Sequence, residues 1–189
     1  MISKGAEKIT AWLIKNNEIE EADKELYQYA LYSFFLTLSP MLLAIVLGSV
    51  MGCLKQSICI ILPFMFIRKF SGGYHAKKSR ICFICSSLLL FLCIEISNYA
   101  KCDRDLFLIT IIAAIILMVF SPIDHENRRL ELKEKQKYKK IASILVLLFV
   151  CLSIGCFTAH KEKEAVCFSI GIILSAGLQL PCILNFIKR

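Results

Sequence analysis

The chain has 189 residues, of which 57% are hydrophobic and only 20% are charged, and its mean hydropathy is +0.65. Apolar runs alternate with clusters of charge. This pattern is typical of a polytopic membrane protein and excludes a secreted disulfide scaffold, a nucleotide-binding α/β enzyme and a disordered tail. The net charge of +8 does not indicate nucleic-acid binding, because no basic stripe is interleaved with aromatic residues and basic flanks are what membrane topology requires.

The N-terminal segment, residues 1–30, is polar but carries apolar residues at helical spacing: Ile2, Ala6, Ile9 and Leu13. We expect an amphipathic helix that lies in the membrane interface, although a solvent-exposed helix would show the same pattern. The segment is predicted to be separate from a six-helix membrane domain that comprises residues 31–189.

Six apolar segments follow, and we predict that each crosses the membrane as a helix: residues 31–54, 56–67, 81–100, 106–123, 141–159 and 165–187. The second segment is short, since it rises only about 18 Å as a helix, and a re-entrant hairpin is the alternative. Charge favours six crossings, because 18 of the 23 Lys and Arg residues then fall on the cytoplasmic side. The predicted fold is therefore all-α, with six transmembrane helices, an N-terminal amphipathic helix and both termini in the cytoplasm.

Gly48 and Gly52 form a GxxxG pattern within the first predicted span. Such a pattern permits close helix approach, either between two copies of the chain in a homodimer or within one chain. Both interpretations are open at this point.

Most of the ten cysteines lie in apolar runs, where a thiol behaves as a small hydrophobic residue. Their spacing matches neither a disulfide framework nor a zinc site. We therefore expect no metal and no other cofactor.

One predicted cytoplasmic stretch, residues 68–82, carries residues that suit nucleophilic chemistry. Cys82 falls in the first turn of the third predicted span, where the helix dipole and nearby basic residues favour a thiolate. His75 precedes it by seven residues, or about 10.5 Å along a continuous helix, which is too far for a thiol–imidazole contact. A dyad therefore requires that the helix begin close to Ile81, after a turn at the preceding diglycine.

A single His and a single Cys in such a loop are incidental more often than catalytic, but their neighbours resemble a known family. The run that contains Arg68, Gly72-Gly73-Tyr74-His75-Ala76 and then Cys82 resembles the membrane peptidases of the accessory gene regulator B (AgrB) family. The stretch from Ser121 to Leu130 is similar to that family's second recurring segment, at the cytoplasmic end of the fourth predicted span. The resemblance covers nearly the whole chain.

The resemblance implies a membrane cysteine endopeptidase that cleaves a small AgrD-like propeptide in Gram-positive bacteria. Such an enzyme holds the peptide as a thioester acyl-enzyme and releases it as the cyclic precursor of a quorum-sensing signal, either a thiolactone or a lactone. By the same resemblance Cys82 is the nucleophile, His75 is its base, and Arg68 and Gly73 occupy supporting positions.

We expect further residues of the site to lie on the same side of the membrane as Cys82 and His75. The backbone N–H groups of Gly72 and Gly73 are candidate donors to an oxyanion, and Asp124 is a candidate partner that orients the imidazole. The expected partners are the propeptide and the lipid bilayer, and we expect no binding to nucleic acid.

Two other function classes fit six spans. The main alternative is a small transporter or peptide exporter without proteolytic activity, and a non-catalytic membrane scaffold is the third. Transport sites are usually marked by ionisable residues near the membrane midplane, and the predicted spans contain almost none apart from Glu95. The peptidase interpretation is therefore favoured.

Overall fold

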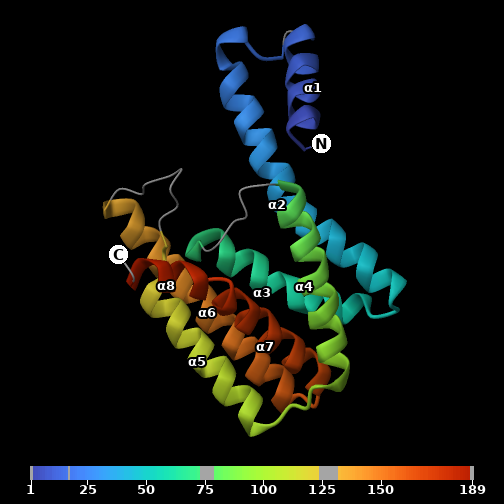
Figure 1. The fold of residues 1–189 in the computed structure, drawn as a ribbon, viewed down its shortest axis with the longest axis vertical. Coiled ribbons are helices and arrows are strands. Elements are labelled where there is room, and N and C mark those ends of the chain that lie inside the picture. Colours follow the sequence, from blue (N-terminus) through green and yellow to red (C-terminus); the bar gives the residue numbers. More distant parts are fainter. Residues whose placement is uncertain (1, 17, 73–78, 124–131, 188–189) are drawn as a thin grey trace. The chain divides into compact units, whose positions relative to one another are not determined.

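A computed structural model of the chain describes residues 2–16, 18–72, 79–123 and 132–187. For residues 2–4, 36–37, 79–83 and 185–187 it describes the backbone and not the side chains. Throughout these ranges the elements are helices and there is no strand, which confirms the predicted all-α class (Figure 1). Three predicted site residues lie outside the described residues: Gly73, His75 and Asp124.

The chain consists of two compact units, which comprise Met1–Leu43 and Ala44–Arg189. The first contains α1 (Ile2–Lys15), the short 3₁₀ helix η1 (Glu21–Asp23) and the first part of α2 (Lys24–Val50). Helix α1 confirms the expected N-terminal helix, which ends at Lys15 within the predicted segment 1–30, and its place in the membrane interface stays a prediction. Ala6 and Thr10 are buried, whereas Ile9 and Trp12 are exposed.

Every predicted apolar segment contains helix in the structure. After α2 come α3 (Leu54–Ser71), α4 (Ser79–Tyr99), α5 (Arg104–Phe120), α6 (Leu132–Thr158), α7 (Glu162–Gly177) and α8 (Leu180–Ile187). Helix α3 is longer than the predicted segment 56–67, because Arg68 and the residues up to Ser71 continue its hydrogen-bonded turns. Helix α3 therefore comes closer to the thickness of a bilayer than the apolar run alone suggested.

The last predicted segment, residues 165–187, is not one continuous helix, and this corrects the sequence-based bounds. Helix α7 ends at Gly177 and α8 begins at Leu180, so that Leu178 and Gln179 lie at a break. Pro181 accounts for the break, because its ring excludes the carbonyl group four residues earlier and it has no N–H to donate.

Within the described ranges, three helical stretches are long and apolar enough to cross a membrane, judged by length and composition: Glu21–Val50, Leu132–Thr158 and Glu162–Leu184. They support the interpretation of the chain as a membrane protein. The crossing of the other predicted spans and the side on which each terminus lies stay predictions.

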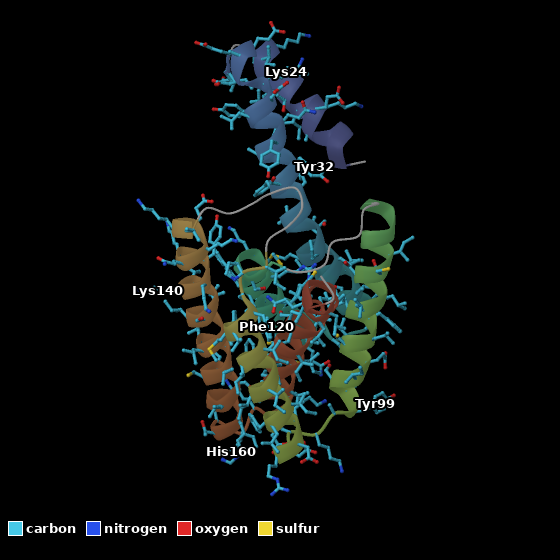
Figure 2. The ribbon with its side chains drawn as sticks, turned by 60° about the vertical axis from the view of Figure 1, so that its left-hand side comes forward. Lys24, Tyr32, Tyr99, Phe120, Lys140 and His160 are labelled. Atoms are coloured by element: carbon cyan, nitrogen blue, oxygen red, sulfur yellow. The ribbon has the colours of Figure 1, made fainter. Side chains whose placement is uncertain are left out.

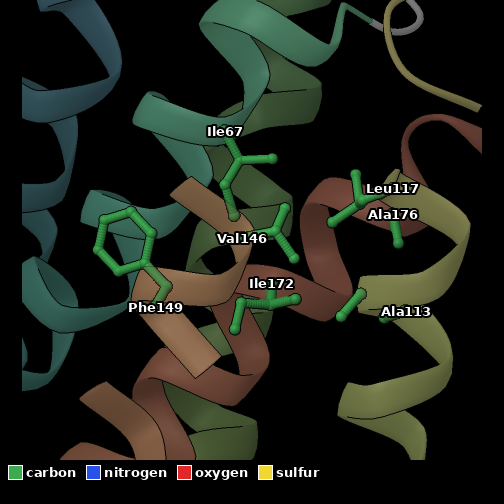
Figure 3. Close-up of a cluster of buried hydrophobic side chains, with 8 residues drawn as sticks. Ile67, Ala113, Leu117, Val146, Phe149, Ile172 and Ala176 are labelled. Atoms are coloured by element: carbon green, nitrogen blue, oxygen red, sulfur yellow. The ribbon is translucent and has the colours of Figure 1, made fainter. Parts of the chain in front are cut away.

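Helix α7 is the central helix of the second unit and packs against α3, α4, α5 and α6. The core combines residues from four helices: Ile67, Ala113, Ala114, Leu117, Val146, Phe149, Ile172 and Ala176 (Figure 3). Gly171 allows α3 to approach α7 closely, since a Cβ there would lie 2.4 Å from the carbonyl oxygen of Ile60. Small residues at a helix contact are typical of membrane bundles.

The two glycines of the GxxxG pattern do not share a helix. Gly48 is buried within α2, and a Cβ there would lie 2.7 Å from the Cβ of Ser57 in α3. Gly52 follows the end of α2 and has a φ of 67°. The close approach at Gly48 is therefore made within the chain, and a homodimer stays a prediction without support from this pattern.

Helices α3 to α7 alternate in direction, so their termini gather at two ends of the unit (Figures 1 and 2). Tyr99 and His160 mark one end in Figure 2, where Lys55 of α3 also forms an ion pair with Glu164 of α7. The opposite end holds the last turn of α3, the end of α5 and the break between α7 and α8.

Candidate active site

Three segments that are far apart in the sequence meet at the end of the bundle that holds Ser71. The backbone N–H of Ile123 donates to the carbonyl oxygen of Ser71 at 3.0 Å. The Nε2 of Gln179 donates to the same carbonyl oxygen at 3.0 Å and to the Oγ of Ser121 at 3.0 Å. Ser71, Ser121 and Gln179 are all buried. The two stretches that carry the family resemblance are therefore in direct contact, through residues at the end of α3 and just after α5.

Gly72 ends α3 in a conformation that glycine alone adopts readily, with φ of 72° and ψ of −156°. A Cβ at this position would lie 2.6 Å from the carbonyl oxygen of Ile123. The residue type is thus set both by the backbone angles and by the close approach of the chain that follows α5.

The N–H of Gly72 is already engaged, because it donates to the carbonyl oxygen of Arg68 at 3.1 Å and closes the last turn of α3. This corrects its proposed role as an oxyanion donor. An N–H that is paired within the protein would have to break that bond before it could stabilise an oxyanion. Of the two predicted diglycine donors, Gly73 keeps that role as a prediction.

Helix α5 ends where Pro122 follows. The residue before a proline is pushed toward the extended region, and Ser121 has φ of −81° and ψ of 148°. Its N–H still donates to the carbonyl oxygen of Leu117 at 3.1 Å, so the chain leaves α5 without an unpaired donor at this point. With this conformation of Ser121, its hydroxyl oxygen lies within hydrogen-bond distance of the Gln179 amide.

Arg68 lies one turn before the end of α3 and is half-buried. Its guanidinium carbon lies 5.5 Å from the centre of the Phe64 ring, within the range of a cation–π contact. A cation in the last turn of a helix also interacts favourably with the helix dipole. The structure therefore places the predicted supporting arginine beside the contact made by Ser71.

Cys82 lies in the first turn of α4, which begins at Ser79. The expectation that this helix begins close to Ile81 is met within two residues, and α3 and α4 are separate helices rather than one straight helix. First-turn N–H groups have no partner within a helix and create a positive potential that favours a thiolate. The distance between Cys82 and His75 stays a prediction.

Gln179 is the residue of this site that sequence reasoning missed. Functional sites in membrane spans are usually marked by ionisable side chains, and an amide is uncharged. A glutamine in an apolar run, two residues before a proline, was the available signal.

Residues 6–181 match the family model described as Accessory gene regulator B. The chain belongs to the AgrB family. An AgrB-like protein of Clostridium perfringens is 27% identical over 150 residues, which cover 75% of this chain and 68% of that protein. The protein FsrB of Enterococcus faecalis is 23% identical over 94% of this chain and 75% of its own length. Accessory gene regulator protein B of Staphylococcus carnosus is 26% identical over 92% of this chain and 91% of its own. No solved structure matches the chain.

Membership confirms the resemblance that the two segments suggested. It implies that this AgrB-family protein takes part in the processing of a quorum-sensing peptide and works with an AgrD-type partner.

Proposed function

We propose that this AgrB-family protein is an integral-membrane cysteine endopeptidase that cleaves an AgrD-like propeptide and supports its cyclisation to the precursor of an autoinducing peptide. The observation that carries the proposal is the contact between the two family segments, made by Ser71 with Ile123 and Gln179. Cys82 lies in the first turn of α4, eleven residues after Ser71 in the sequence.

The proposed chemistry is acyl transfer by a Cys–His dyad. His75 takes the proton of the Cys82 thiol, and the thiolate attacks the carbonyl carbon of the scissile peptide bond. The tetrahedral intermediate collapses, the C–N bond breaks, and the His75 imidazolium gives its proton to the departing amine. The N-terminal part of the propeptide is then held on Cys82 as a thioester.

A thioester preserves the reactivity that cyclisation needs. A thiol or hydroxyl of the bound peptide gives its proton to His75 and attacks the thioester carbonyl carbon. The C–S bond to Cys82 breaks, Cys82 regains the proton as a thiol, and a thiolactone or a lactone is formed. The exchange of one thioester for another is nearly isoenergetic, whereas hydrolysis would discard the acyl group. A site at the membrane interface, where water is restricted, favours the cyclisation over hydrolysis.

Supporting roles are proposed for residues around this dyad. Arg68 provides a positive charge for the peptide, the Gly73 N–H donates to the oxyanion, and Asp124 orients the imidazole. Gly72 supports the site through its backbone conformation, which allows the close approach of Ile123.

The proposed topology has six spans and places both termini and the site on the cytoplasmic side. Its support is the alternation of helix directions together with the charge at the Ser71 end, where Lys69 ends α3 and a run of lysines begins α6. The membrane domain is proposed to comprise residues 31–189, after the interfacial segment 1–30.

The test is cleavage of the propeptide by the full chain in proteoliposomes. Cys82→Ala is expected to abolish cleavage, and Cys82→Ser to lose nearly all of it, because a hydroxyl of high pKa is a poor nucleophile without stronger activation. Cys85→Ala is the matched control, since Cys85 lies in the same helix and is exposed. The wild-type protein, and not Cys82→Ala, is expected to gain the mass of the N-terminal fragment as a hydroxylamine-sensitive adduct.

Two results would contradict the proposal. Full cleavage by Cys82→Ala removes the thiol mechanism. Transport of the intact propeptide by both the wild type and Cys82→Ala, without cleavage by either, favours the exporter.

A further inference from the structure

We propose that Gln179 is a positioning residue for the acyl transfer. Its side-chain amide fixes the end of α3 against the segment after α5, and so sets the direction in which the chain leaves Ser71 toward His75. The catalytic part of this inference rests on the proposed function, whereas the structural part rests on the hydrogen bonds of Gln179 alone.

The orientation of the amide follows from its neighbours. A backbone carbonyl oxygen only accepts hydrogen bonds, so the atom that lies 3.0 Å from the Ser71 oxygen must be Nε2. The second N–H of the same nitrogen reaches the Oγ of Ser121, also at 3.0 Å. Both donors of the amide are thus used, and each one ends on a different segment of the site.

The backbone of Gln179 is held on both sides, which makes the amide a fixed point. Its N–H donates to the carbonyl oxygen of Ala176 at 2.9 Å, and its own carbonyl oxygen accepts from the N–H groups of Cys182 and Ile183. The side chain is fully buried, with 0% of its surface exposed. Because its backbone is anchored on both sides, the amide can hold the groups that it binds in fixed positions.

The groups that Gln179 binds lie just before the proposed catalytic residues in the sequence. Ser71 precedes the diglycine, and Ser121 precedes Asp124 by three residues. The Ser71 carbonyl oxygen accepts from Gln179 and from Ile123 together, so that this one atom joins all three segments. A shift of the amide would therefore move the starting points of both chains that carry the site, and small displacements of reacting groups reduce rates strongly.

Two substitutions of Gln179 remove the donation in different ways. Gln179→Glu keeps the shape but places a carboxylate oxygen or a single hydroxyl donor against the Ser71 carbonyl. Gln179→Leu removes all polar atoms. The matched control is Gln56→Leu, because Gln56 and Gln179 each have a buried Oε1 without a hydrogen-bond partner among the described residues. Gln56 lies about 22 Å from Ser71 along α3.

Two measurements on the full chain in proteoliposomes test the role. The first is the single-turnover rate of acyl-enzyme formation with the propeptide. The second is the pH profile of Cys82 alkylation by N-ethylmaleimide, in a variant that keeps Cys82 as its one cysteine. Both Gln179 variants are expected to slow acylation about tenfold or more and to shift the alkylation profile to higher pH, because the proposed contact of the His75 imidazole with the Cys82 thiol is lost. Gln56→Leu should change neither.

A structural role alone predicts a different pattern. If Gln179→Leu lowers the melting temperature as Gln56→Leu does, while the acylation rate and the alkylation profile stay those of the wild type, the inference is overturned. If the Gln179 variants do not insert, Ser121→Ala serves instead, since it removes one of the two acceptors; an unchanged alkylation profile in that variant also overturns the inference.

The failure of the proposed function looks different again. It appears as an absence of any Cys82-dependent acyl-enzyme in the wild type. The alkylation measurement uses no substrate. In that case the pH profile of Cys82 alkylation alone decides whether Gln179 influences the surroundings of the Cys82 thiol.

Discussion

Gly72 combines two features that exclude a side chain at this residue. Its φ of 72° and ψ of −156° lie in a region used almost only by glycine, where other residues incur a strain of about 1–3 kcal/mol. A Cβ would also lie 2.6 Å from the carbonyl oxygen of Ile123, a backbone atom that no side-chain rotation can move away. An added methyl group must therefore displace either the end of α3 or the segment after α5.

We predict that Gly72→Ala lowers both thermal stability and propeptide cleavage. The melting temperature in detergent and the cleavage rate in proteoliposomes are the measurements. Gly5→Ala is the control, since a Cβ at Gly5 has no atom within 4 Å, and it should behave as the wild type. A Gly72→Ala protein with wild-type stability and activity would show that the contact with Ile123 does not matter.

At the residue scale, sequence and chemistry predict those features that depend on local spacing. The seven residues between His75 and Cys82 required a helix start near Ile81, and α4 begins at Ser79. The diglycine predicted a turn, and Gly72 ends α3. The hydrogen bonds of Gln179 could not be predicted, because they join residues more than fifty positions apart and no local period reports such a contact.

The packing of α3 on α7 depends on Gly171 at the scale of whole helices. A Cβ there would lie 2.4 Å from both the Ile60 carbonyl oxygen and the Pro63 ring, so α3 would have to move away from α7. We predict that Gly171→Ala destabilises the bundle by about 1–3 kcal/mol, as overpacked sites do. The measurement is thermal or denaturant unfolding in detergent.

Gly155→Ala in α6 provides the matched comparison for this prediction. Gly155 is exposed and a Cβ would meet no atom within 4 Å, so alanine should be neutral or stabilise the helix by up to about 1 kcal/mol. If both substitutions had the same effect, the close approach of α3 to α7 would not limit stability.

Helix ends were predictable where a local chemical group fixes them. Asp103 caps α5 by accepting a hydrogen bond from the N–H of Leu106 at 3.0 Å, close to the predicted start at residue 106. The start of α6 was not predicted, because its first turns are rich in lysine and the apolar run begins only near Ile141. Hydropathy reports the part of a helix that lies in lipid, whereas the hydrogen-bonded helix extends beyond it.

At the scale of the whole molecule, the order of the apolar segments predicted a bundle of alternating helices, and the described helices follow that order. Neither the central place of α7 nor the meeting of the three segments at Ser71 was predicted from the sequence. All the spans are apolar, so hydropathy does not distinguish a helix that is surrounded by others from one that faces lipid. Such a distinction depends on packing of small residues such as Gly171, whose partners lie in another helix.

The orientation of the bundle leads to the last prediction. Lys69 at the end of α3 and Lys137 near the start of α6 belong to the Ser71 end, whereas Lys101 and Lys161 belong to the end marked by Tyr99 and His160 in Figure 2. The excess of basic residues at the Ser71 end predicts that it faces the cytoplasm.

Single cysteines placed at positions 69 and 137 of a cysteine-free variant should therefore resist a membrane-impermeant maleimide on intact cells. Cysteines at 101 and 161 should react, and all four should react after permeabilisation. Labelling at 69 and 137 with protection at 101 and 161 would invert the bundle and place the site outside. Labelling at 69 together with 101 would show that α4 does not cross, and the propeptide would then need another route to Cys82.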